Sequence, residues 1–364
     1  MLPEPITLEQ LGWDPAWDEE FADLRAAGFE PGRVAVEDKH HYLVHTASGP
    51  VTGIASGKLL HESEVPANLP KVGDWVALSL LPNEPKAVIH QVLPRRTKFS
   101  RKVPGRDTEE QVLVANVDVV FLVQALDESF RPRLIERHLI MIHESGSRPV
   151  VVLNKADLCA DFRQTLEAAE SAAAGVPVVI VSAKTGEHID QLKESIHPGE
   201  TVVFIGPSGV GKSSLINCLC GEEVQATTEV RAGDSKGRHT TTWRELIALP
   251  QGGIVIDTPG MREFQLWLAG QGVHGAFSDF EALAPNCRFR DCSHTHETGC
   301  AVKEAVAGGQ VPGERYENFL KLQRELAYLD EAQHQRACLD RKRKTKAAQR
   351  AFNKIKRRAN AQDA

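Results

Sequence analysis

Two short motifs stand in an unusual order along this chain of 364 residues. Residues 206–213 read GPSGVGKS and match the pattern G-x-x-x-x-G-K-[ST] of a loop that binds phosphates. Residues 154–157 read NKAD, a pattern that selects a guanine base, and they precede the phosphate loop instead of following it. A phosphate loop ordinarily opens its domain. The reversed order therefore predicts a circularly permuted nucleotide-binding domain whose chain ends have moved and whose site is intact.

The phosphate loop connects a predicted strand, residues 202–205, to a predicted helix with an apolar face. Small residues in the loop let backbone N–H groups point at a triphosphate. We expect Lys212 to reach the β and γ phosphates and the Ser213 hydroxyl to bind Mg²⁺. The predicted phosphate contacts are Gly206, Pro207, Ser208, Gly209, Val210, Gly211, Lys212, Ser213 and Ser214.

Two segments at the ends of successive predicted strands select the base. The Asp157 carboxylate can accept hydrogen bonds from guanine N1–H and the exocyclic amine, a donor pair that adenine lacks. The stem of Lys155 would lie along the ring, and a backbone N–H near Ala183 would meet the guanine oxygen. Alone, the NKAD tetrad could be a helix N-cap and the SAK tripeptide an ordinary turn, but together they favour GTP. The predicted base contacts are Asn154, Lys155, Ala156, Asp157, Ser182, Ala183 and Lys184.

The hydrolytic side of the site is predicted from residues 257–260, which read DTPG. In the pattern D-x-x-G, Asp257 would lie near Mg²⁺ and the Gly260 N–H would face the γ-phosphate. Thr241 is expected to close onto Mg²⁺ when the γ-phosphate is present, in a segment that moves without ligand. Met261 cannot orient water, so we predict slow intrinsic hydrolysis. His239 is our hypothesis for the group that positions water, and a loop histidine that contacts a partner or solvent is the alternative.

Within fourteen residues the chain offers three thiolates and an imidazole as a ligand set: Cys287, Cys292, His294 and Cys300. Three thiolates and an imidazole suit a closed tetrahedral zinc site, which leaves no open position for catalysis. Neighbouring His296 could replace His294, and a scatter of buried cysteines is the other interpretation. We predict one structural zinc ion per chain.

The chain is too long for one ordinary core, so two or three domains are expected. Residues 1–32 are predicted to be a loosely attached leader and residues 33–100 a small OB-type β-barrel. Residues 101–265 would form the permuted α/β domain, 266–335 a mainly helical zinc-binding domain, and 336–364 a basic tail. Apolar runs alternate with helical patterns in the α/β part, as a parallel sheet covered on both faces requires.

The barrel is inferred from about five short β-rich segments, one of them residues 53–59. OB-type and SH3-like barrels are both common at this size, and such a barrel binds RNA or serves as a plain scaffold. A basic cluster that follows within eight residues favours RNA: Arg95, Arg96, Lys98, Arg101 and Lys102.

Charge is distributed unevenly. The net charge is −6, yet residues 336–358 hold eleven Arg or Lys and one Asp, a net +10 that leaves −16 for the rest. This run is either a solvated or disordered tail or an arm attracted to a phosphate backbone, and the acidic body favours the second reading. No run approaches a membrane span and the start does not resemble a signal peptide, so we expect a cytoplasmic protein.

Taken together, these segments resemble the circularly permuted, ribosome small-subunit-dependent GTPases of bacteria, the RsgA/YjeQ type. The resemblance covers the VGDWV segment at 72–76, NKAD, SAK, GPSGVGKSS, GRHTTT, DTPG and the Cys-Cys-His-Cys cluster, in that order. It implies an assembly factor that binds the 30S subunit and 16S rRNA, hydrolyses GTP when the subunit stimulates it, and leaves while releasing other maturation factors. We expect it to act as a monomer. The departures lie in the leader and the tail.

Two other classes of protein share some of these sequence features. A P-loop metabolic kinase would have no use for the NKAD tetrad, and nucleotide preference separates it from a GTPase. A non-catalytic RNA-binding protein would explain the barrel, the zinc module and the tail, yet it leaves the nucleotide motifs unused. Because residues 257–260 lead directly into the zinc module, GTP and GDP forms are expected to differ mainly in the orientation of that module.

Overall fold

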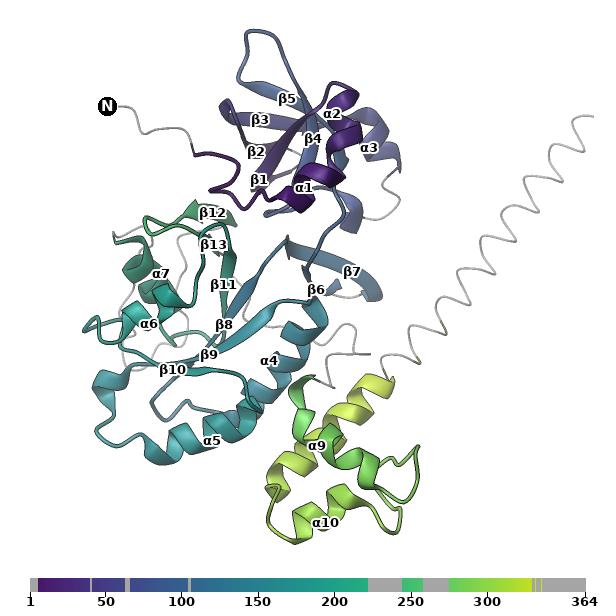
Figure 1. Ribbon diagram of the computed structural model, residues 1–364, viewed down its shortest axis with the longest axis vertical. Helices are drawn as coiled ribbons and strands as arrows, with labels where there is room; N and C mark the ends of the chain where they lie inside the picture. Colours follow the sequence, from purple (N-terminus) through teal and green to yellow (C-terminus); the bar gives the residue numbers. More distant parts are fainter. Residues whose placement is uncertain are drawn as a thin grey trace, which may run out of the picture.

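We describe the protein from a computed structural model of the chain. The structure describes residues 6–39, 41–62, 66–103, 106–221, 244–257 and 275–328, together with positions 331 and 335. Figure 1 shows a barrel at the top, an α/β domain in the middle and a C-terminal helical module at the bottom. No helix within these described ranges is both long and apolar enough to span a bilayer.

Five strands close the barrel. They follow the order β1-β2-β3-β5-β4, and β4 pairs again with β1. The β3–β5 pair is parallel and the other pairs are antiparallel, which gives the five-stranded OB-type barrel predicted from the sequence. The strands are β1 (Glu30–Asp38), β2 (His41–Thr46), β3 (Gly49–Ala55), β4 (Trp75–Leu80) and β5 (Lys86–Val92).

One barrel segment differs from its prediction. Residues 53–59 were expected to be a strand, but β3 ends at Ala55 and helix α3 (Gly57–Glu62) follows, with the short helix η1 (Pro66–Asn68) beyond it. Leu59 packs into the barrel core from α3. The apolar residue that we assigned to a strand is therefore buried from a helix instead.

The prediction of a loosely attached leader is wrong. Helices α1 (Pro15–Glu20) and α2 (Ala22–Ala26) lie against the barrel (Figure 1), and Trp17 and Phe21 are almost completely buried. Trp13 meets Trp75 of β4 edge to face, with ring centroids 4.7 Å apart. Large aromatic side chains bury enough surface to hold a short segment that lacks a core of its own.

A buried arginine joins the leader, the barrel and the α/β domain. Arg33 of β1 is 2% exposed, and its guanidinium donates to the carbonyls of Leu11, Gly73 and Asn116. It also donates to the Thr201 hydroxyl at 2.7 Å, at the start of strand β11 (Thr201–Ile205). Burial lowers the pKa of Arg33 to about 10, so the side chain stays charged at neutral pH.

The α/β domain has a six-stranded sheet in the order β10-β9-β8-β11-β13-β12. Its first five strands are parallel, and β12 is antiparallel to β13 and meets β1 of the barrel at one residue pair. The strands are β8 (Val119–Ala125), β9 (Arg148–Asn154), β10 (Val178–Ile180), β11 (Thr201–Ile205), β12 (Glu245–Ala248) and β13 (Ile254–Asp257).

Helices cover both faces of this sheet, as the near-continuous apolar strands predict. One face packs on α4 (Pro132–Ser145) and α5 (Arg163–Ala173), and the other on α6 (Ile189–Glu194) and α7 (Lys212–Cys220). Strand β11, which carries the phosphate loop, lies between β8 and β13 although β8, β9 and β10 precede it in the chain. The sheet is therefore assembled in a circularly permuted order.

A two-stranded hairpin that the sequence did not reveal links the barrel to this domain. It consists of β6 (Lys98–Val103) and β7 (Arg106–Ala115). Strand β12 was also missed, because its four residues are too short for a clear alternating pattern.

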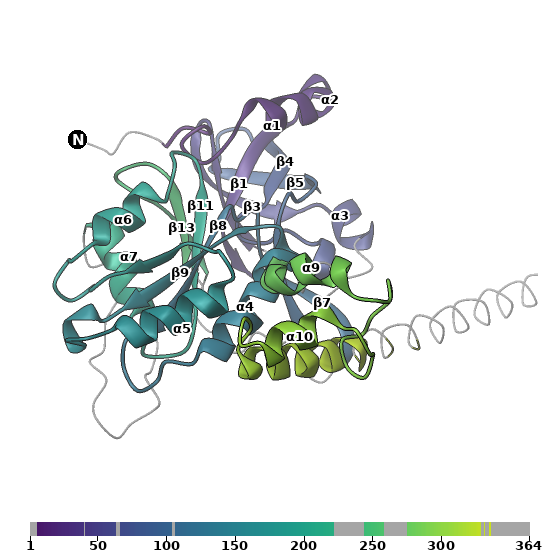
Figure 2. The same ribbon diagram turned by 60° about the horizontal axis from the view of Figure 1, so that its bottom comes forward.

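The C-terminal module contains α9 (Ser278–Leu283), η3 (Ala284–Asn286), α10 (Ala301–Ala307) and helical residues 313–328. Phe277, Phe280 and Phe319 form its aromatic core, with centroids 4.7–5.5 Å apart. Both views place the module beside α4 (Figures 1 and 2), and Ser278 and Arg315 also donate to backbone carbonyls at the C-terminal end of α5. Arg315 fixes this contact through a buried ion pair with Glu136 of α4.

Candidate nucleotide and metal sites

Glycines shape the phosphate loop. Gly206, Gly209 and Gly211 have φ values of +139°, +80° and +95°, which other residues rarely adopt. A Cβ on Gly206 would lie 2.2 Å from the Val123 carbonyl oxygen, and one on Gly211 would lie 2.2 Å from Nδ2 of Asn154. The loop thus needs glycine both for its backbone and for its close neighbours.

Lys212 opens helix α7 directly after this loop. Its Nζ donates to the carbonyl oxygens of Gly206 and Pro207 at 2.8 and 2.7 Å. The ammonium therefore lies over the concave side of the loop, where incoming phosphates could take over these bonds. Ser213 follows in the first turn of α7 and is partly exposed.

Asn154 ends β9 and holds two loops together. It is 2% exposed, its Nδ2 donates to the Val210 carbonyl at 2.8 Å, and its Oδ1 accepts from the Ala183 N–H at 3.0 Å. The amide thus joins the phosphate loop to the loop after β10. Each of its polar atoms has one partner within the protein, and because Nδ2 can donate a second hydrogen bond, Asn154 stays a predicted base contact beside Asp157.

Asp157 is exposed beside these loops, and one carboxylate oxygen accepts from the Ser182 hydroxyl at 2.6 Å. A carboxylate has about four lone-pair positions, so this bond leaves acceptors for a base. Ser182 is fully buried, while Lys184 is exposed at the rim. Strands β9 and β10 are neighbours, which explains how NKAD and SAK meet.

Lys155 has a partner that the sequence did not suggest. Its Nζ lies 2.9 Å from Oδ2 of Asp127, in the loop after β8. Partial burial raises the pKa of Asp127, but hydrogen bonds from Ser129 and Lys155 outweigh it and lower the pKa below its usual value. In the sequence, only the position of Asp127 could have suggested this pair, since Asp127 follows a buried parallel strand at the edge where such sheets bind ligands.

The hydrolytic residues are only partly placed. Asp257 ends β13, is 8% exposed, and lies opposite Glu245 of β12. His239, Thr241, Gly260 and Met261 lie outside the described residues, as does the rest of the segment expected to move. Their predicted roles therefore stay predictions.

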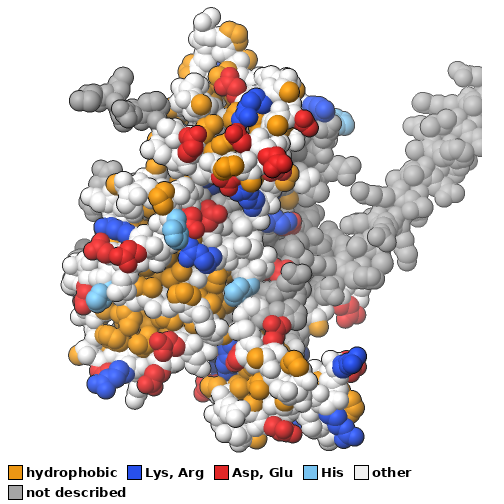
Figure 3. All heavy atoms as spheres, viewed as in Figure 1, with side chains coloured by type: hydrophobic (Ala, Val, Ile, Leu, Met, Phe, Trp, Pro, Cys, Tyr) orange, Lys and Arg blue, Asp and Glu red, His pale blue; other side chains and the backbone are white. Residues whose placement is uncertain are grey.

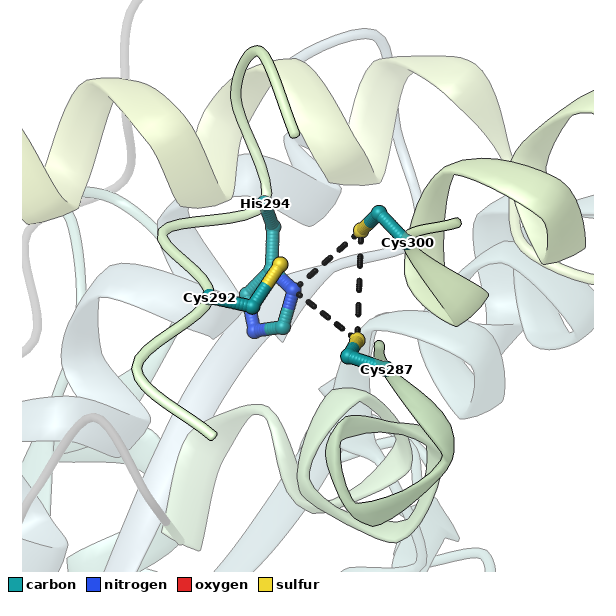
Figure 4. Close-up of side chains that lie close together, drawn as sticks. All are labelled: Cys287, Cys292, His294 and Cys300. Carbon is teal, nitrogen blue, oxygen red and sulfur yellow. Dashed lines mark hydrogen bonds between the residues drawn. The ribbon is translucent and has the colours of Figure 1, made fainter. Parts of the chain in front are cut away.

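The Cys/His cluster is assembled as predicted, and Figure 4 shows His294 among the sulfurs, whereas His296 is exposed and is not in the group of potential ligands. The four ligand atoms lie within 4.8 Å of one another. His294 Nδ1 is 3.6 Å from Cys287 Sγ and 3.4 Å from Cys300 Sγ, and the two sulfurs are 4.0 Å apart. Zinc–sulfur bonds of about 2.3 Å would place tetrahedral ligands about 3.8 Å apart, so the cluster fits zinc.

Neighbouring side chains orient the ligand loop. Tyr316 donates from its hydroxyl to the His294 carbonyl at 2.6 Å, and Glu297 accepts from the backbone N–H groups of Ser293 and Thr295. His294 has φ +62°, a conformation that a fixed loop must maintain. The cluster is therefore braced by surrounding bonds, as metal ligands usually are.

Comparison with known proteins agrees with this geometry. The sequence model of the family described as RsgA GTPase matches residues 92–267. The small ribosomal subunit biogenesis GTPase RsgA of Opitutus terrae is 46% identical over 332 residues, covering 89% of this chain and 90% of that protein. This chain belongs to the RsgA GTPase family. It is accordingly a GTP-hydrolysing enzyme with a permuted domain.

Further relatives and solved structures match most or nearly all of this chain. The RsgA of Syntrophotalea carbinolica is 38% identical over 360 residues, covering 97% of this chain and 98% of that protein. The crystal structure of YjeQ from Thermotoga maritima has a TM-score of 0.64 at 29% identity and covers 82% of this chain and 99% of that one. A structure of YloQ, titled a circularly permuted GTPase, has a TM-score of 0.61 at 23% identity, with 82% and 95% covered, and supports the fold.

Proposed function

We propose that this GTPase is a late assembly factor of the small ribosomal subunit. It binds the 30S subunit through 16S rRNA, and hydrolysis stimulated by the subunit drives its release and that of other maturation factors. The convergence of the phosphate loop, Asn154 and the Asp157–Ser182 pair around one nucleotide site carries the GTPase part of this proposal. The relatives named as small ribosomal subunit biogenesis GTPases support the ribosomal part.

In this proposal each part of the site has one task. Asp157 accepts from the guanine edge, the phosphate-loop N–H groups and Lys212 bind the phosphates, and Ser214 contributes at the start of α7. Ser213 and Thr241 would hold Mg²⁺, which neutralises charge on the phosphates when it is bound. Asp257 supports that position from β13, and the Gly260 N–H meets the γ-phosphate.

RNA binding needs exposed basic groups, and the cluster after the barrel does not supply them all. Arg95 donates to both carboxylate oxygens of buried Asp74 and to two backbone carbonyls. Arg96 pairs with Asp14 and stacks on Trp17, and Lys98 pairs with Glu110. Arg95 therefore braces the structure, whereas Arg96 and Lys98 have side chains 42% and 44% exposed and remain candidates for the RNA contact predicted from this cluster.

A loop of the C-terminal module offers a better RNA contact. Between Cys287 and Cys292 lie Arg288, Phe289, Arg290 and Asp291, all exposed, with Phe289 43% accessible. The Arg288 guanidinium lies 5.6 Å from the Phe289 ring centroid. Lys and Arg side chains reach the surface at the outer edge of this module (Figure 3). An aromatic ring between two arginines suits unpaired RNA bases and their phosphates.

The remaining assignments belong to the same proposal. One structural zinc ion would be held by Cys287, Cys292, His294 and Cys300, where it braces the loop just described. The protein would act as a monomer in the cytoplasm, and the basic tail from residue 336 would add attraction to rRNA.

The test is GTP turnover by the full-length protein with and without purified 30S subunits. We expect slow turnover alone and strong stimulation by 30S, whereas 50S subunits serve as the control. Asp157→Asn should remove the preference for guanosine over adenosine nucleotides. Turnover that does not rise when 30S subunits are added, or an unchanged base preference in this variant, would contradict the proposal.

His239 is tested separately because it lies outside the described residues. We predict that His239→Ala retains GTP binding and loses 30S-stimulated turnover, since the variant removes the group proposed to position water. Single-turnover hydrolysis in the presence of 30S measures this. Full stimulated turnover would assign water positioning to another residue.

A further inference from the structure

The loop that follows β8 has no part in any motif named above. In the sheet, β8 lies between β11, which carries the phosphate loop, and β9, which carries the NKAD tetrad. The carboxyl ends of parallel strands face the ligand, so a side chain just after β8 lies between the two halves of the nucleotide site. Asp127 occupies this position, two residues after the strand ends.

The two oxygens of Asp127 have different partners. Oδ1 accepts from the backbone N–H of Ser129 at 2.9 Å and also from the Ser129 hydroxyl, which fixes the carboxylate within its own turn. Oδ2 accepts from Nζ of Lys155 at 2.9 Å. Both members of this pair are less than one-third exposed, so water screens the pair less than it screens a surface ion pair.

Lys155 itself has an unusual backbone. Its φ of +68° lies in the left-handed region, which costs energy for a residue with a side chain. Such local strain tends to persist where surrounding structure needs it, and here the next N–H, of Ala156, is held by the Val181 carbonyl. The backbone of Lys155 is thus fixed from one side and its ammonium from the other.

We propose that Asp127 is a positioning residue for nucleotide binding. It holds the extended Lys155 side chain along the guanine ring and so sets how long a guanine nucleotide stays bound. A free lysine side chain would lose rotational freedom each time a base arrived. Because Asp127 already holds its ammonium, Lys155 loses this rotational entropy before the base binds. The complex with the nucleotide is therefore more stable and dissociates more slowly.

The experiment measures release of a fluorescent GDP from the full-length protein in the absence of ribosomes. We expect Asp127→Asn to release it about fivefold faster, as for the loss of one partly buried ion pair. Asp127→Glu, which keeps the carboxylate, should restore part of the lifetime. The control is Asp190→Asn, which removes a carboxylate from an exposed pair with Lys193 in α6 and should leave release unchanged.

A double-mutant cycle separates positioning from a general structural effect. Lys155→Met keeps an unbranched stem without the charge, and in this background Asp127→Asn should add nothing. An equal acceleration in both backgrounds, or an unchanged release rate in Asp127→Asn, would overturn the proposal. If Asp127→Asn does not fold, Asp127→Glu in both backgrounds decides by the same criterion. Because no ribosome is present, failure here leaves the ribosomal proposal untouched, and the reverse is also true.

Discussion

Single residues in this protein act through close neighbours from distant parts of the chain. Gly211 and Gly221 show this clearly, because they flank the same helix α7 and both have left-handed backbones. Gly211 lies against the Asn154 amide, whereas a Cβ on Gly221 would meet none of the described residues within 4 Å. Replacing Gly221 with alanine therefore tests only the backbone conformation, whereas the same change at Gly211 also tests the contact with Asn154.

We predict that Gly211→Ala weakens GTP binding at least about tenfold, because its Cβ would displace the amide that joins the two loops. Gly221→Ala should cost only about 1 kcal/mol of unfolding free energy from its backbone and keep normal affinity. Titration with a fluorescent GTP analogue, alongside thermal unfolding, compares the two. Equal affinities would contradict the importance of the Gly211 contact.

A second residue-scale prediction concerns acid stability at the leader. The hydrogen bond from Arg96 lowers the pKa of Asp14 to about 2, below an ordinary value of about 3.9. A depressed carboxyl pKa adds stability that is complete above about pH 4 and is lost as pH falls towards 2. Asp14→Asn keeps a good N-cap for α1, so it should be less stable than the natural protein near pH 6 and approach it near pH 2. Urea unfolding at a series of pH values measures this, and a constant difference would contradict it.

Among the elements, the loop from Cys287 to Cys292 combines rigidity with exposed groups. The backbone N–H of Cys287 donates to the Ala284 carbonyl, and the N–H of Arg288 donates to the Gly299 carbonyl. The metal ligands would fix its two ends, so Phe289 is presented to solvent from a braced loop. A flexible loop would lose more entropy on binding.

We predict that Phe289→Leu weakens binding to 30S subunits about tenfold, as loss of one base–aromatic stack would. Tyr328→Leu is the matched control, because Tyr328 is also an exposed aromatic, 74% accessible, in the helical residues 313–328. Filter binding to labelled 30S subunits measures both variants, with nucleotide affinity as a check of folding. Equal losses would show that the loop has no special role.

At the scale of the whole molecule, the C-terminal module is joined to the α/β domain by a polar network. Arg315 bonds with Glu136, Asp279 and the Ala276 carbonyl, and Arg315 and Glu136 have side chains only 4% exposed. Arg137 forms a bidentate ion pair with Glu325. Buried ion pairs add little net stability compared with apolar contacts, but they penalise any docking that leaves a charge unpaired. The network therefore favours one orientation of the module. This orientation is what we expect to differ between the GTP-bound and GDP-bound forms.

Removal of zinc should affect this module and spare the nucleotide site. Among the described residues, the core under α6 and α7 contains none from the module, and the two nucleotide loops are joined by Asn154. We predict that a chelator selective for zinc over magnesium makes residues 275–328 protease-sensitive while GTP affinity changes less than about twofold. Limited proteolysis and nucleotide titration measure this, and added zinc should restore resistance. Loss of GTP binding would show that the two parts share their stability.

The sequence by itself determined the local chemistry of this protein. A phosphate loop, a base-reading tetrad and a Cys/His spacing are encoded in adjacent residues, so the permuted α/β domain and the cluster with His294 were predictable from motifs and apolar periodicity. Only the tertiary structure decided which polar groups remain available. It committed Arg95 to Asp74, turned Asn154 inward and paired Lys155 with Asp127. It also buried Trp17 of a leader that looked loose. These outcomes depend on contacts between segments far apart in the chain, and local pattern carries no information about which distant partner a side chain will meet.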